Sequence, residues 1–162
     1  MQNKQKEKGF SLIELLIVVA IILIIAAIAI PNLLRSRIAA NESSAVGSLR
    51  TINSAEITYA STYPSLGYSP DLNSLAGSSC GAPTSSAACL IDATLAAATS
   101  STSPGKSGYY FTYGASSSLG YTLTAQPHHA GSTGNKFFYT DGTAVIHYNN
   151  GSGATSSSPA IQ

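Results

Sequence analysis

The chain is poor in charged residues, and this scarcity narrows the classes of protein to which it can belong. Of its 162 residues only 9% are Asp, Glu, Lys or Arg, and the formal net charge is +1 at pH 7. No basic patch with interleaved aromatic residues occurs, so nucleic acid is not an expected partner. From residue 63 onward the few charges stand among Ser, Thr, Gly, Ala and Tyr: Asp71, Asp92, Lys106, Lys136 and Asp141. A surface hydrated by hydroxyls and amides is more typical of exported proteins than of cytosolic enzymes.

Residue patterns that carry catalysis are also missing. No phosphate-binding loop, nucleophile elbow or haem-attachment motif occurs. His128, His129 and His147 could be read with Asp141 as a metal or acid–base site, but adjacent side chains on an extended chain point in opposite directions. No Glu or Cys lies near these histidines in the sequence. We therefore expect no catalytic residue, no metal and no cofactor, and the protein is not expected to be an enzyme.

Cysteine is scarce as well, with Cys80 and Cys89 alone in the chain. A zinc site at this pair lacks ligands, because no His or other Cys lies nearby. A disulfide bond between the two residues is the better interpretation, and it requires an oxidising compartment. Two free buried thiols are the alternative.

What the sequence has in abundance is an uninterrupted apolar run. Phe10 to Ile30 is 21 residues long, and its polar side chains are those of Ser11 and Glu14. A helix of this length spans roughly 32 Å, about the thickness of the hydrocarbon core of a bilayer. A helix buried in a soluble protein would show a polar face, and this run has none. Residues 10–30 are therefore predicted to form a transmembrane helix.

Glu14 is the unusual residue of the run. A carboxylate at the centre of a bilayer costs about 2.5–3.5 kcal/mol on insertion scales. Glu14 lies only one turn into the run, where the positive end of the helix dipole returns about 0.3–1 kcal/mol. It is either a tolerated charge at the membrane edge or a group that awaits a positive partner.

The orientation in the membrane does not follow from counting charges. Three lysines precede the run and three arginines follow it within about twenty residues: Lys4, Lys6, Lys8, Arg35, Arg37 and Arg50. The nine residues before Phe10 are too few to fold. The expected disulfide and the large C-terminal part therefore place the folded part outside and the N-terminus inside.

The helix is expected to continue, now amphipathic, so that one long helix covers residues 10–63. The apolar residues after the run recur on one helical face: Leu34, Ile38, Ala45, Leu49, Ile52, Tyr59 and Tyr63. Pro31 predicts a kink or a local unwinding. The amphipathic face is expected to pack on the chain's own globular part, with a coiled coil as the alternative.

The rest of the chain is expected to end in an antiparallel sheet. Residues 64–107 are rich in turn formers and read as a connecting region held at its middle by the disulfide loop. In residues 108–150 the apolar period changes to two, and Asp141-Gly142 is a strong signal for a two-residue hairpin turn. Residues 151–162 are expected to be a flexible tail. The predicted fold class is α+β, a long N-terminal helix on a sheet of about four antiparallel strands.

The residues around Gly9 resemble a known signal. Lys8 to Ile17, KGFSLIELLI, is similar to the class III signal sequence of bacterial type IV pilins and of the pseudopilins of type II secretion. The stretch YTLTAQPHHAGSTGNKFFYTDGTAVIHY also resembles the C-terminal sheet of many pilins. The resemblance implies that a prepilin peptidase removes residues 1–9 by cutting after Gly9 and methylates the new terminus at Phe10. Glu14 then becomes the fifth mature residue and Pro31 the twenty-second, two positions tied to assembly in that family.

This resemblance implies two successive locations for the protein, one for the precursor and one for the mature chain. The precursor would sit in the bacterial inner membrane with a cytoplasmic N-terminus, and the mature chain would join an extracellular helical filament of identical copies. Implied partners are the prepilin peptidase, the pilus assembly platform with its ATPase, and a secretin. Two alternatives stay open, a pseudopilin of a type II secretion system and a singly anchored surface domain that does not assemble. A filament of this kind could serve motility, adhesion or another role.

Overall fold

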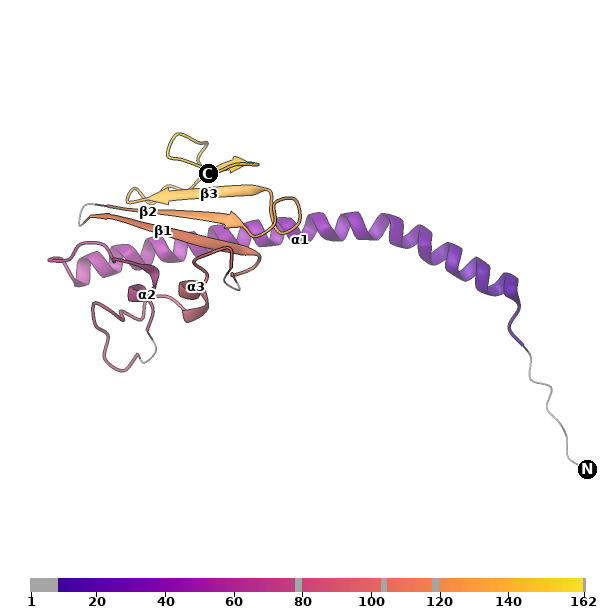
Figure 1. Cartoon of the computed structure of the whole chain (residues 1–162), viewed down its shortest axis with the longest axis horizontal. Coiled ribbons are helices and arrows are strands. Elements are labelled where there is room, and N and C mark those ends of the chain that lie inside the picture. The colour runs from indigo at the N-terminus through magenta and orange to yellow at the C-terminus, as the bar shows by residue number, and fades with distance from the viewer. Residues whose placement is uncertain (1–8, 78–79, 103–104, 118–119, 162) are drawn as a thin grey trace, which may run out of the picture. The chain divides into compact units, whose positions relative to one another are not determined.

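The computed structural model describes residues 9–77, 80–102, 105–117 and 120–161. The elements follow in the order α1 (Leu12–Thr62), α2 (Leu72–Leu75), α3 (Ala93–Ala97), β1 (Tyr109–Ser117), β2 (Gly120–Pro127), β3 (Lys136–Asp141) and β4 (His147–Asn150), as Figure 1 shows. The chain divides into two compact units, residues 1–36 and residues 37–162. The leader expected at residues 1–9 lies outside the described residues except for Gly9.

The first unit contains the apolar part of α1. Its large side chains are exposed along the whole run, from Leu12 at 79% to Ile30 at 65%. Pro31 lies inside α1, and the helix continues through it without a break. The local unwinding that Pro31 predicted therefore does not occur.

The second unit is built on a four-stranded antiparallel sheet with the strand order β1-β2-β3-β4, which is a simple meander. The register pairs Phe111 with Ala125 and Ala125 with Phe138 across three strands. In β2 the side chains of Tyr121, Leu123, Ala125 and Pro127 are buried and those between them are half-buried. The period of two in the sequence thus selects one face of the sheet for the core.

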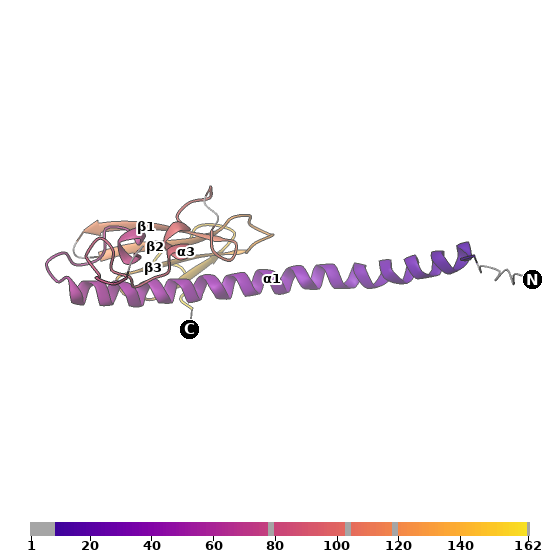
Figure 2. The same ribbon diagram turned by 90° about the horizontal axis from the view of Figure 1, so that it is seen from below.

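The part of α1 that follows Arg37 covers this buried face (Figure 2). Its buried residues recur at helical spacing and join the sheet in one apolar core: Ala45, Leu49, Ile52, Ala55 and Tyr59. Tyr63, the last residue of the predicted stripe, is partly buried against this core. The predicted α+β fold, a long helix packed on an antiparallel sheet, is confirmed.

The connecting region forms two short helices, each started by a side-chain cap. Asp71 accepts a hydrogen bond from the backbone N–H of Ser74 at the start of α2, and Asp92 accepts one from Leu95 at the start of α3. Such caps satisfy N–H groups that a helix leaves without a partner. The backbone N–H of Phe111 donates to the carbonyl of Ala98 at 2.7 Å, which covers the outer edge of β1.

The turn between β3 and β4 is longer than the sequence predicted. Asp141-Gly142 predicted a two-residue loop, whereas five residues, 142–146, separate the two strands. The carboxylate of Asp141 accepts hydrogen bonds from the backbone N–H and the hydroxyl of Thr143, and Ala144 follows with φ +60°. These local bonds hold a wider turn, which brings Ile146 into the core.

The last residues also differ from the flexible tail that their composition suggested. The backbone N–H of Tyr148 donates to the carbonyl of Pro159, and that of Ile161 donates to the carbonyl of Ile146. Ile161 packs against the apolar core, and Ala154 is buried. The free edge of β4 offers unpaired backbone groups, and residues 159–161 satisfy them.

Candidate functional site

The first turn of α1 is organised by Ser11 and Glu14. The backbone N–H of Ser11, the residue before the helix, donates to Glu14 Oε2 at 2.9 Å. A carboxylate that reaches back to the capping residue in the pattern Ser-x-x-Glu is one half of a capping box. This pattern is visible in the sequence as Ser11-Leu12-Ile13-Glu14, and our sequence analysis missed it. Glu14 thus starts the helix besides carrying a charge.

One carboxylate oxygen of Glu14, Oε1, can still accept a hydrogen bond. Among the described residues, Ser11 is its hydrogen-bonding partner, and the structure records no ion pair at Glu14. The other predicted site residues of this segment lie apart from it. Gly9 and Phe10 precede the helix in exposed, irregular chain, and Pro31 lies inside the helix. A single chain therefore leaves Glu14 Oε1 open to a donor from elsewhere.

The surface around this turn is almost wholly apolar. Among the described residues, α1 is the helix long and apolar enough to cross a membrane, and its most apolar stretch is 0% buried. Exposed apolar surface on this scale marks a membrane or protein interaction site. The physical requirement is a cover of lipid or of other helices.

In the second unit, a buried carboxylate ties α1 to the sheet. Glu56 is fully buried, and its carboxylate accepts hydrogen bonds from the backbone N–H of Ser69 at 3.0 Å and from the Ser69 hydroxyl at 2.6 Å. The hydroxyl of Tyr113 on β1 donates to it at 2.7 Å. Burial raises the pKa of the Glu56 carboxyl, while the hydrogen bonds from Ser69 and Tyr113 oppose that rise. Glu56 is not among the apolar residues of the predicted helical face, so nothing in the sequence pattern indicated this role.

A second polar cluster lies farther along the same helix face. The buried amide of Asn53 donates to the Thr140 hydroxyl at 3.0 Å and accepts a hydrogen bond from the Tyr121 hydroxyl at 2.9 Å. Burial raises the pKa of Tyr121 well above its ordinary value. Tyr121 also contacts the rings of Tyr68 and Tyr113. Polar pairs of this kind fix the register between helix and sheet, because a slip would leave them without partners.

Cys80 and Cys89 form a disulfide bond with their Cα atoms 5.7 Å apart. The hydroxyl of Tyr59 on α1 donates to the carbonyl of Ser85 inside the loop at 2.8 Å. The backbone N–H of Cys89 donates to the carbonyl of Ala76. The predicted disulfide is therefore present, and its loop is held against the helix and the end of α2.

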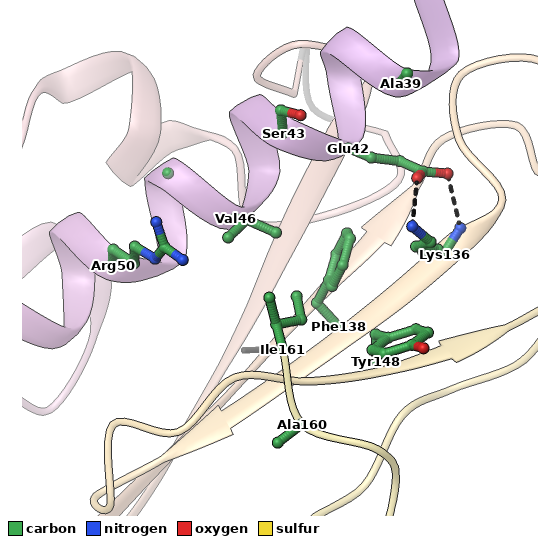
Figure 3. A pocket seen from close by; sticks show the side chains of 11 residues that line it. Ala39, Glu42, Ser43, Val46, Arg50, Lys136, Phe138, Tyr148, Ala160 and Ile161 are labelled. Atoms are coloured by element: carbon green, nitrogen blue, oxygen red, sulfur yellow. Dashed lines mark hydrogen bonds and ion pairs between the residues drawn. The ribbon is translucent and has the colours of Figure 1, made fainter. Parts of the chain in front are cut away.

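A groove of about 790 Å³ opens between α1 and the β3–β4 side of the sheet. Figure 3 shows Val46, Phe138 and Ile161 lining it, with Arg50 extending from the helix beside them. At the other end Lys136 Nζ lies 3.4 Å from Glu42 Oε2, and the backbone N–H of Lys136 also donates to Glu42. The groove is thus apolar at its centre. The Lys136–Glu42 ion pair lies at one end and the Arg50 guanidinium at the other.

The histidines do not gather into a site. His128 and His129 have ring centroids 6.5 Å apart, and His147 Nδ1 lies 2.6 Å from the carbonyl oxygen of Ser158. Within the described ranges, no three residues among His, Cys, Asp and Glu are grouped to hold a metal ion.

Comparison with known proteins finds similarity over part of this chain. The family described as the prokaryotic N-terminal methylation motif matches residues 4–30. A type IV wide pilus major component from Thermus thermophilus, PilA4, is 67% identical over 36 residues, which are 22% of this chain and 28% of that protein. A type IV major pilin protein from Myxococcus xanthus, PilA, is 44% identical over 54 residues, which are 33% of this chain and 24% of that protein.

The matched segments thus span only about a quarter of the length of each of these relatives. The family model covers the apolar part of α1, whose large side chains are exposed. The relatives are structural subunits of pili and not enzymes.

Proposed function

We propose that this chain, as a member of the bacterial type IV pilin and pseudopilin family, is a subunit of a type IV pilus. The subunits polymerise through their apolar helices. The observation that carries this proposal is the exposed apolar surface of α1 from Leu12 to Ile30, whose large side chains are between 46% and 79% exposed. Lipid covers this surface in the precursor, and the helices of neighbouring copies cover it in the filament.

Processing after Gly9 follows from the same proposal. The bond between Gly9 and Phe10 lies in exposed chain ahead of the helix, where a membrane peptidase can reach it. The cut removes the leader with its three lysines and frees an α-amino group on Phe10, which the same enzyme methylates. A cation then stands four residues before Glu14, at the edge of the apolar segment.

Glu14 supplies the partner for this cation in a neighbouring copy. Its Oε2 caps its own helix through Ser11, while Oε1 faces no donor among the described residues. An ammonium of a second copy that meets Oε1 neutralises two charges inside an apolar bundle. Loss of one partner of a buried pair costs about 3–5 kcal/mol, enough to reject a subunit that enters out of register.

Pilin is favoured over pseudopilin by the loop of Asp141. Major pseudopilins carry calcium on acidic residues in the loops of the C-terminal sheet. Here Asp141 belongs to no group of three or more His, Cys, Asp or Glu residues in the described part of the chain, and Thr143 and Tyr139 donate to its oxygens. Its pKa is lowered by these hydrogen bonds, although burial works against them.

The proposed setting follows from the family. The precursor lies in the inner membrane with its N-terminus in the cytoplasm and residues 37–162 outside. The prepilin peptidase, the assembly platform with its ATPase and the secretin act on it in turn. The mature chain is then extracellular, and its partner is its own sequence.

Substitution of Glu14 tests the assembly mechanism. Glu14→Gln keeps an oxygen for the Ser11 N–H but removes the charge, and Glu14→Val removes both. We expect both variants to be cleaved normally and to yield few or no filaments, measured as the amount of processed chain in sheared and in membrane fractions. Ser11→Ala is the matched control, because it leaves the charge and the backbone N–H in place. Normal filaments from Glu14→Gln would show that charge pairing is not the basis of assembly.

A further inference from the structure

A filament made by repeating one contact between identical copies needs two different surfaces that fit each other on every copy. The apolar helices supply one set of contacts. The second unit carries features of its own that suit a second contact, and this inference rests on the proposed assembly into a filament. Two of those features are complementary in polarity and charge, namely the groove of Figure 3 and the turn that follows α1.

The groove offers an apolar floor and an unpaired cation. Val46, Phe138 and Ile161 form the floor: Val46 and Ile161 are half-buried, and Phe138, at 1% exposed, belongs to the apolar core. Lys136 at one end is already paired with Glu42. Arg50 at the other end is exposed, and no ion pair is recorded for it in the described part of the chain. An occupant should therefore carry an apolar side chain and a free carboxylate.

Residues 64–71, the tip segment, carry both groups. Leu66 is 50% exposed, and Asp71 is exposed with one oxygen, Oδ1, used to cap α2. Asp71 Oδ2 accepts no hydrogen bond from the described residues. The segment is held firmly, because the backbone N–H groups of Leu66 and Gly67 donate to the carbonyl of Tyr63 and that of Ser69 donates to Glu56. A rigid segment loses little entropy when it binds.

Two other large apolar side chains among the described residues of the second unit are exposed, but neither has a free carboxylate next to it in the sequence. Ile57 is 58% exposed on α1, and the nearest carboxylate in sequence, Glu56, is buried. Val145 is 41% exposed beside Asp141, but both oxygens of Asp141 already accept hydrogen bonds from Tyr139 and Thr143. Of the three, the tip segment alone complements the groove in charge.

We propose that the groove of one copy receives the tip segment of another, with Leu66 on the apolar floor and Asp71 paired with Arg50. From Val46 to the end of α1 at Thr62 the helix rises by about 24 Å at 1.5 Å per residue. Two copies displaced along the helix by about this distance bring tip and groove to the same height. The contact joins unlike surfaces, so it propagates as a filament and does not close into a dimer.

Paired cysteines test the contact in filaments made by the full chain with its assembly machinery. Ser43 lines the groove and Ser65 precedes Leu66, and both are exposed. We expect the double variant Ser43→Cys/Ser65→Cys to form a ladder of disulfide-linked multimers on mild oxidation, while each single variant does not. The pair Ser43→Cys/Ser152→Cys is the matched control, since Ser152 is exposed but outside the tip segment.

The outcomes of this experiment are distinguishable. Filaments without a ladder, or a cross-link to a different protein, would overturn the tip-in-groove contact while leaving the pilus function intact. Absence of filaments from the unsubstituted chain would overturn the proposed function itself.

Charge removal provides a second test that does not depend on cysteine. Arg50→Gln and Asp71→Asn each remove one charge, and Asn still caps α2. We expect each variant to raise the ratio of free subunit to filament roughly twofold to fivefold. This is the effect on an equilibrium constant that the loss of one exposed ion pair produces. The double variant should be no worse than either single one. Lys106→Gln with Asp92→Asn, which breaks a pair within one chain at 2.8 Å, should leave filaments unchanged. Additive losses, or no loss, would refute the pairing.

Discussion

Replacing Glu56 by Ala should destabilise the folded part of the chain by about 2 kcal/mol at neutral pH. The change removes the acceptor of the Ser69 backbone N–H, and a buried donor left without a partner costs about 1–3 kcal/mol. The other two donors keep partners, because the Tyr113 hydroxyl also lies 2.8 Å from the carbonyl of Ser69 and the Ser69 hydroxyl lies 3.1 Å from that of Asp71. The lost packing adds to the cost, and the relief of a buried charge offsets part of it.

Glu56→Gln separates hydrogen bonding from charge. Gln keeps an oxygen for the Ser69 N–H and buries no charge, so its stability should stay within about 1 kcal/mol of the unsubstituted chain. Because burial raises the folded pKa of Glu56 above its ordinary value of 4.5, the folded chain binds this proton at a higher pH than the unfolded chain. The contribution of Glu56 is therefore greatest below pH 4.5 and declines as the pH rises through the raised pKa.

Chemical denaturation of the full chain in mild detergent, followed by near-ultraviolet circular dichroism of the nine tyrosines, measures these differences. The unsubstituted chain should gain stability relative to Glu56→Gln as the pH is lowered from 7 toward 4.5. Equal losses for the Ala and Gln variants would refute the role of the Ser69 hydrogen bond. A relative loss of stability on acidification would refute the sign of the pKa shift.

Three further predictions concern the same folded unit. Replacing Cys80 and Cys89 together by Ser should lower the free energy of unfolding by up to about 2.7 kcal/mol relative to the disulfide-bonded chain, measured by chemical denaturation. An unchanged free energy would mean that the loop is held in place without the disulfide. Asn53→Ala should cost about 2 kcal/mol, because the buried Tyr121 hydroxyl loses its acceptor, and a cost near zero would show that water replaces the amide. Asp92→Ala should cost about 1 kcal/mol through loss of the α3 cap, whereas Asp92→Asn should cost only a few tenths, and equal costs would assign the effect to the ion pair with Lys106.

Periodicity carried most of the fold prediction. Apolar residues first form a continuous run, then recur every three or four residues, and alternate with polar ones after Gly108. These changes in spacing are enough to predict the helix, the sheet and the face that each buries. Tyr121, Leu123 and Ala125 are buried as their alternation predicts. Asp71 and Asp92 precede the two short helices, where capping residues are expected.

The misses share a physical cause, which is that they depend on partners distant in sequence or on local polar bonds. Ser69 and Tyr113 lie 13 and 57 residues from Glu56 in the sequence, so no local pattern indicated that they would bind its carboxylate. The tail composition suggested disorder, yet residues 159–161 satisfy the edge of β4. The turn after Asp141 widened because its carboxylate bonds to Thr143.

The central claim is that this chain is cut after Gly9 and polymerises through its apolar helix. Intact-mass and N-terminal peptide analysis of filaments sheared from the native host tests it most directly. The account predicts an abundant chain that begins at N-methylated Phe10. Processed chain that stays in short assemblies in the cell envelope would indicate a pseudopilin instead. A chain that still begins at Met1 and remains monomeric in the membrane while the assembly machinery is present would contradict the account.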